Sequence, residues 1–113
     1  MSRTILFAFV GAFFASGAAL AKDTRFWNLT SSTVKSLELA PASTTAFGPN
    51  QCLNDPDGAV DHDERLKVTG IIKGTYDARL MLADGRKCLA KNVRIEEGKP
   101  FAIEEKDLRD CTN

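Results

Sequence analysis

A short acidic segment, residues 54–64 (NDPDGAVDHDE), holds the side chains in this sequence that are best suited to binding a cation. Its candidate ligands are Asp55, Asp57, Asp61 and Glu64. A calcium loop of the helix-loop-helix type has oxygen ligands at fixed positions and a glycine at its sixth position. With Gly58 at that position, the four carboxylates fall at the third, fifth, ninth and twelfth positions. The segment is therefore a candidate calcium site, in which a bound cation orders residues 54–64.

The same segment also fits a solvated acidic turn between two strands. The first position of the loop falls on Leu53, which has no side-chain oxygen, and Pro56 stiffens the middle. A strand is predicted where a calcium loop has its exit helix. In this alternative the carboxylates are balanced by the basic side chains of Arg65, Lys67 and Lys73. The calcium site predicts that Asp61→Asn loses stability in calcium, whereas the solvated turn predicts a neutral or mildly stabilising change.

His62 is the only histidine and lies ten residues after Cys52. A thiol beside an imidazole can act as a nucleophile with its base, but neither residue has a recognisable catalytic flank. Zinc binding through the cysteines has little support, because the sequence has no C-x-x-C pair and no second histidine. We therefore predict an exposed His62, no catalytic residues, and no cofactor other than the candidate calcium ion.

Three cysteines, Cys52, Cys88 and Cys111, allow one disulfide and leave one thiol. Spacing alone leaves all three pairings open. A bond from Cys88 to Cys111 would hold a C-terminal tail that otherwise frays. By closing the loop between these residues, the bond would also stabilise the folded state by about 3 kcal/mol on the chain-entropy model. We predict the disulfide Cys88–Cys111 and a free Cys52, which could link two chains if it is exposed.

Residues 1–21 have the pattern of a secretory signal peptide. Arg3 precedes the apolar run ILFAFVGAFF, and Ala19-Leu20-Ala21 has the small residues that signal peptidase needs. An uncleaved membrane anchor is the alternative, although the run is short for a bilayer core of about 30 Å. The residue directly after the cleavage point is Lys22 rather than a cysteine, which argues against a lipoprotein. The sequence thus predicts a periplasmic or secreted protein whose mature chain, residues 22–113, has no membrane span.

The charge balance limits the class of partner. Lys and Arg together number 15, as do Asp and Glu. This balance gives no reason to expect nucleic acid, and no basic amphipathic stretch suggests a membrane surface. We expect a non-catalytic binding module whose partner is a protein or a component of the cell envelope.

Alternating apolar and polar residues predict strands along most of the mature chain. The predicted strands are 25–30, 34–40, 66–72, 76–82, 89–95 and 101–103. Asp84-Gly85 marks a hairpin turn, residues 41–51 have loop composition, and residues 104–111 could form one helical turn. This pattern predicts an all-β fold, a small antiparallel β-sandwich of one domain.

The alternation also assigns side chains to the faces of these strands. Asp77 falls on the strand face opposite Tyr76, and Lys91 is out of pattern at a predicted bulge. The core or the sheet edges should hold the aromatic residues Phe26, Trp27, Tyr76 and Phe101.

A series of short motifs runs through the mature chain. It consists of Phe26 and Asn28, Leu37 and Leu39, Phe47-Gly48, Tyr76-Asp77 and Asp84-Gly85. In this order the motifs resemble a family of small exported bacterial β-sandwich domains with no settled activity. The Gly74-x-Tyr76 element is also similar to the last hairpins of transthyretin-like and collagen-binding accessory domains. These resemblances imply an exported β-sandwich and a non-catalytic module.

Overall fold

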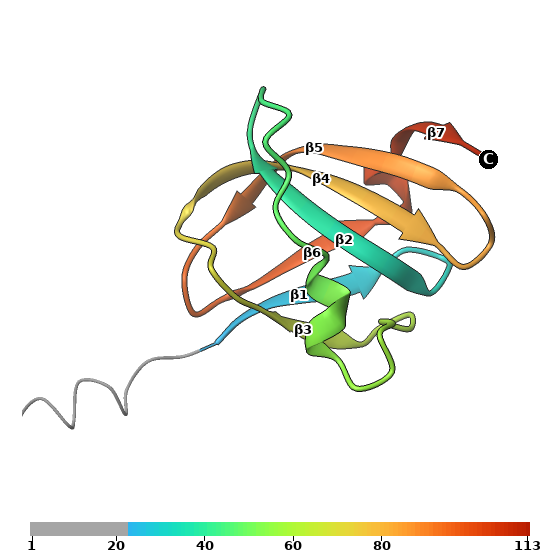
Figure 1. The fold of residues 1–113 in the computed structure, drawn as a ribbon, viewed down its shortest axis with the longest axis horizontal. Helices are drawn as coiled ribbons and strands as arrows, with labels where there is room; N and C mark the ends of the chain where they lie inside the picture. Colours follow the sequence, from blue (N-terminus) through green and yellow to red (C-terminus); the bar gives the residue numbers. More distant parts are fainter. Residues whose placement is uncertain (1–22) are drawn as a thin grey trace, which may run out of the picture.

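Strands with alternating apolar and polar side chains form two sheets. Figure 1 shows these sheets in the computed structural model. The structure describes residues 23–113, and the predicted signal peptide at residues 1–21 lies outside the described residues. One sheet has the order β3-β1-β6, with β1 at Thr24–Leu29, β3 at Arg65–Val68 and β6 at Pro100–Glu104. The other has the order β2-β4-β5-β7, with β2 at Val34–Pro41, β4 at Gly74–Leu82, β5 at Lys87–Ile95 and β7 at Arg109–Thr112. The prediction of an all-β fold is confirmed.

Two short 3-10 helices complete the described chain. η2 spans Gln51–Asn54 and η3 spans Glu105–Asp107. Among the described residues, no helix is long and apolar enough to cross a membrane.

The two sheets share one core. Their inward side chains form a single cluster that includes Phe26, Leu37, Leu66, Leu80, Ile95, Phe101 and Ile103. The rings of Phe26 and Phe101 lie on neighbouring strands with their centroids 5.8 Å apart. Alternation along much of each strand turns these side chains inward, and they meet between the two sheets. Of the four predicted aromatic packing residues, Phe26, Tyr76 and Phe101 are buried and Trp27 is half-buried.

One strand pair differs from the predicted antiparallel arrangement. β1 and β6 run parallel, with Phe26 opposite Phe101 and Asn28 opposite Ile103. The other registered strand pairs are antiparallel. Parallel and antiparallel strands have the same two-residue side-chain period, so alternation cannot reveal their relative direction. The chain returns from the second sheet to the first through the turn before Pro100, which brings β6 beside β1.

Two element boundaries also differ from the prediction. The strand predicted at 66–72 ends at Val68, because Gly70 turns the chain with a φ of 73°. The helical turn predicted within 104–111 is confirmed as η3, but the residues after it form β7. All four residues of β7 are exposed, so the strand carries no apolar alternation by which it could be recognised.

The bulge predicted at Lys91 is confirmed. Tyr76 pairs with Val93 and Ala78 pairs with Ala90, so Asp77 alone faces Lys91 and Asn92. Asn92 adopts a φ of 57°, a left-handed conformation that a bulge can accommodate. This irregularity directs the N–H of Asn92 toward the carboxylate of Asp77.

Candidate binding site between two loops

A cavity of about 420 Å³, here called the loop cavity, opens between the loop after β2 and the loop between β3 and β4. The first loop, residues 42–50, contributes Ala46, Gly48 and Pro49, and the second contributes Thr69, Gly70 and Ile71. The strands behind them contribute Leu39, Pro41 and Tyr76, and η2 contributes Gln51. None of these lining residues carries a charge. The loop cavity is therefore suited to a neutral, mainly apolar group.

The end of the first loop is held along the free edge of β2. The N–H of Gly48 donates to the carbonyl of Leu39 at 2.9 Å. The side-chain oxygen of Asn50 accepts the N–H of Leu37 at 3.0 Å and the N–H of Cys52 at 2.9 Å. In Figure 1 this segment runs beside β2 and leads directly into η2. Asn50 thus caps η2 and closes the edge of β2 with the same oxygen.

The beginning of the same loop is held by a buried carboxylate, Asp77, which is 3% exposed. One of its oxygens accepts the N–H of Ser43 at 3.0 Å, and the other accepts the N–H of Asn92 at 3.1 Å. Lys91 lies 3.5 Å from the carboxylate. The N–H of Asn92 and then that of Ser43 lower the pKa of Asp77. Asp77 is buried although it alternates with the apolar residues of β4, because the loop and the bulge cover its face of the strand.

Ser43 and Asn92 share an unusual backbone conformation. Their φ angles are 66° and 57°, in the left-handed region that few residues other than glycine favour. A single carboxylate accepts a hydrogen bond from each of them. Asp77 therefore fixes the start of the loop and the bulge of β5 together.

The second wall of the cavity is tied to η2 by a side-chain amide. Gln51, which is 4% exposed, donates to the carbonyl of Thr69 at 3.0 Å and accepts the N–H of Thr69 at 3.0 Å. Asn54 donates both to Gln51 and to the carbonyl of Lys67, each at 2.9 Å. The two amides occupy the outer edge of β3 as a short strand would. On the other side, the hydroxyl of Tyr76 donates to the carbonyl of Ile72 at 2.8 Å.

Apolar side chains also stand exposed on the elements beside the cavity. Ile72 follows the lining residue Ile71 and is 69% exposed. Leu53 lies in η2, two residues after Gln51, and is 75% exposed.

Three of the four predicted calcium ligands accept hydrogen bonds from three different donors. Asp55 accepts the N–H of Asp57 at 2.8 Å, and Glu64 accepts the N–H of Asp61 at 2.9 Å. Asp61 accepts the hydroxyl of Thr33 at 2.8 Å. Within residues 23–113, no three His, Cys, Asp or Glu side chains are arranged to hold a metal ion. The calcium site stays a prediction, and the hydrogen bonds described give these carboxylates a local role in shaping the turns.

His62 and Cys52 occupy different environments. His62 is exposed, as predicted, and its Nδ1 lies 2.7 Å from the carbonyl of Thr30. Cys52 is fully buried, with its sulfur 3.7 Å from the carbonyl of Val34. Burial and, to a lesser extent, the charge of Asp55 raise the pKa of the Cys52 thiol to about 11. The thiol is thus protonated near neutral pH and, contrary to the exposed case considered above, cannot reach a second chain.

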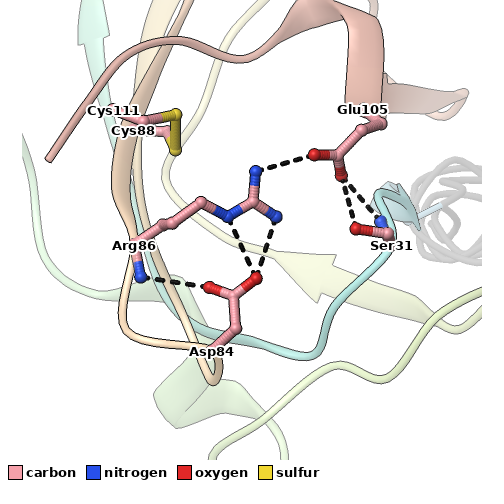
Figure 2. The surroundings of a disulfide bond; sticks show 6 residues. All are labelled: Ser31, Asp84, Arg86, Cys88, Glu105 and Cys111. Carbon is pink, nitrogen blue, oxygen red and sulfur yellow. Dashed lines mark hydrogen bonds and ion pairs between the residues drawn. A yellow bond between two sulfur atoms is a disulfide. The ribbon is translucent and has the colours of Figure 1, made fainter. Parts of the chain in front are cut away.

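The predicted disulfide Cys88–Cys111 is confirmed, and Cys52 is free. Figure 2 shows the ion pairs next to it, which tie η3 to two turns. Arg86 pairs with Asp84 of its own hairpin at 2.9 Å and with Glu105 of η3 at 2.7 Å. Glu105 also accepts the N–H and the hydroxyl of Ser31, at 2.9 and 2.8 Å. These bonds, that of Arg86 first, lower the pKa of Glu105 to about 2.

Comparisons of the chain with protein-family models, with curated proteins and with solved structures found no match. The resemblance to exported bacterial β-sandwich domains and to transthyretin-like hairpins therefore stays a prediction.

Proposed function

We propose that this protein is an exported, non-catalytic β-sandwich module that binds a partner protein or an envelope component through the loop cavity. The signal-peptide pattern of residues 1–21 supports export to the periplasm or beyond the cell. The Cys88–Cys111 disulfide fits an oxidising compartment. Two sheets that share one core support a sandwich arrangement.

The observation that carries the proposal is the uncharged, mainly apolar lining of the loop cavity. Its volume of about 420 Å³ falls in the usual range for ligand sites, roughly 300–1,000 Å³. A charged group placed there would lose its hydration without gaining an opposite charge, so the bound group is neutral. Ile72 and Leu53, on elements next to the cavity, are large exposed apolar side chains that a protein partner could cover.

The calcium-responsive alternative has no comparable observation in its favour. Three of its four carboxylates, those of Asp55, Asp61 and Glu64, each accept a hydrogen bond within a local turn or loop, as described above. A calcium titration of the mature protein is the direct test of that alternative.

A neutral dye that fluoresces in apolar surroundings, Nile red, tests the loop cavity. The two plugging variants are Ala46→Phe and Thr69→Phe, which add a ring from opposite walls. We expect the mature protein to bind the dye and at least one plugging variant to lose most of that binding. Ala83→Phe is the matched control, because Ala83 is an exposed residue of the β4–β5 turn outside the cavity.

Melting temperatures recorded for all variants separate a plugged cavity from an unfolded protein. Full dye binding by both plugging variants, with folds intact, would contradict the proposal. So would an equal loss of binding in Ala83→Phe.

A further inference from the structure

The edges of the two sheets are not equally protected. Unpaired edge strands can pair with another chain, and natural proteins cover or interrupt them. The edge of β2 is covered by the segment from Gly48 to Asn50 and by a bridge between Val34 and Val60. The edge of β3 is covered by the amides of Gln51 and Asn54. β7 is only four residues long and is interrupted by Asp110, whose φ is 54°.

β6 is the exception. Within residues 23–113 it pairs with β1 on one side and with no strand on the other. The neighbouring part of β5 is also open, because β7 is registered only with Lys87 and Leu89. A groove of about 240 Å³, here called the edge groove, lies between residues 91–94 of β5 and the middle of β6.

Specific residues limit the unpaired edge of β6 at both of its ends. Pro100 begins β6 and has no N–H to offer. At the other end, the carboxylate of Asp107 accepts the N–H of Glu104 at 2.8 Å. Alternate residues of β6 pair with β1, so only the backbone groups between these ends that are turned away from β1 are available to an added strand, and that strand is short.

The wall of the edge groove formed by β5 is positively charged. Lys91 and Arg94 are both exposed and both line the groove. Among the described residues, Arg94 has no ion-pair partner, while Lys91 lies 3.5 Å from the buried Asp77. The one acidic lining residue, Asp107, is already engaged by Glu104.

We infer that the edge groove docks a short, extended, acidic segment of a partner protein, which adds to β6 as a strand. Main-chain hydrogen bonds to β6 supply the pairing, as in other cases of strand addition. Arg94 and Lys91 select carboxylates, because opposite charges at an interface steer association and favour the right partner. This inference does not depend on the loop cavity, which shares no lining residue with the edge groove.

The probe is a capped peptide of alternating glutamate and valine, added to the ¹⁵N-labelled mature protein and followed by amide NMR. We expect shifts concentrated at residues 91–95 and 100–104, with slower hydrogen exchange in β6. The Arg94→Glu variant should bind roughly tenfold more weakly, the equivalent of about 1.4 kcal/mol. Lys35→Glu, an equal charge reversal on the exposed side of β2, should change the affinity by less than about twofold.

Two control peptides isolate the roles of charge and backbone. A lysine–valine peptide tests charge, and the acidic peptide with prolines at alternate positions tests strand pairing. Equal binding by either control, unchanged affinity of Arg94→Glu, or shifts at the loop cavity would overturn the inference. So would the absence of shifts at millimolar peptide, or protection of β6 by self-association alone. Because the dye assay reports only on the loop cavity, failure here is distinguishable from failure of the proposed function.

Discussion

The two loops on either side of η2, residues 42–50 and 54–64, differ in whether their polar contacts are buried or exposed. Residues 42–50 are held by partners that are shielded from water, above all Asp77, which is 3% exposed. Residues 54–64 are rich in exposed carboxylates that accept hydrogen bonds from nearby donors. A buried group that loses its partner cannot turn to water, whereas an exposed group can. The less charged loop should therefore depend more strongly on its polar contacts.

Asp77→Ala should produce the largest loss of stability, and it tests the contrast between the two loops most directly. It leaves the N–H groups of Ser43 and Asn92 without their acceptor and Lys91 without its charge partner. We expect the free energy of unfolding to fall by about 2 kcal/mol, because two N–H groups lose a buried acceptor that water replaces only in part. Urea unfolding measures this loss. Asp57→Ala, the same change in the acidic segment, should cost less than about 0.5 kcal/mol. Equal losses in the two variants would contradict the contrast between the loops.

Gln51→Ala should have an intermediate effect. It removes both hydrogen bonds to Thr69 and uncovers the edge of β3. Thr69 is exposed, so water can replace part of what is lost, and we expect a cost of about 1.5 kcal/mol in urea unfolding. Asn54→Ala should cost less, because Asn54 is itself exposed. If Asn54→Ala proved the more damaging change, the amide of Gln51 would not be the main support of this wall.

Acid should weaken the buried network more gently than Asp77→Ala does, because protonation leaves the side chain in place. The pKa of Asp77 is lowered from its usual 3.8, so its contribution to stability is fully present above that value. That contribution is lost as the pH falls through the lowered pKa of the folded state. Glu105, with a pKa lowered to about 2, acts in the same direction as the pH falls below 4.5.

Unfolding measured from pH 6 to pH 2 tests this dependence. Asp77→Asn, which cannot ionise, should lose less stability on acidification than the unmodified protein does. The part due to Glu105 should remain. An identical acid dependence in the two proteins would show that the ionised form of Asp77 contributes nothing.

The sequence was informative where a residue's surroundings follow from local alternation. The long strands, the Asp84-Gly85 hairpin and the bulge at Lys91 were predicted because each depends on neighbouring residues. The parallel pairing of β1 with β6 depends on how the chain crosses between sheets, which alternation does not encode. The exposed strand β7 has no apolar face to reveal it.

The candidate site was harder to predict than the fold. The acidic segment attracted attention through its charge, whereas the loop cavity is lined by uncharged residues spread from Leu39 to Tyr76. The burial of Asp77 results from a loop that folds over its strand, a contact between residues 34 positions apart. Pro41, Gly48 and Pro49 marked this loop as irregular, and Asn50 before Gln51 was the available signal for a capped helix.

The smallest expected effect concerns the acidic segment itself. Asp61→Asn keeps an oxygen that can accept the hydroxyl of Thr33 and removes one charge from a stretch of like charges. Without calcium we expect the change to be neutral or stabilising by less than about 0.5 kcal/mol. Thermal unfolding with and without millimolar calcium checks this, and calcium should leave both melting temperatures unchanged. If the segment did bind calcium, the ion would raise the melting temperature by mass action, and Asp61→Asn or Glu64→Gln would abolish that rise. A rise that disappears in both variants would thus reverse the comparison, because the acidic segment would then be ordered by a ligand rather than by its own hydrogen bonds.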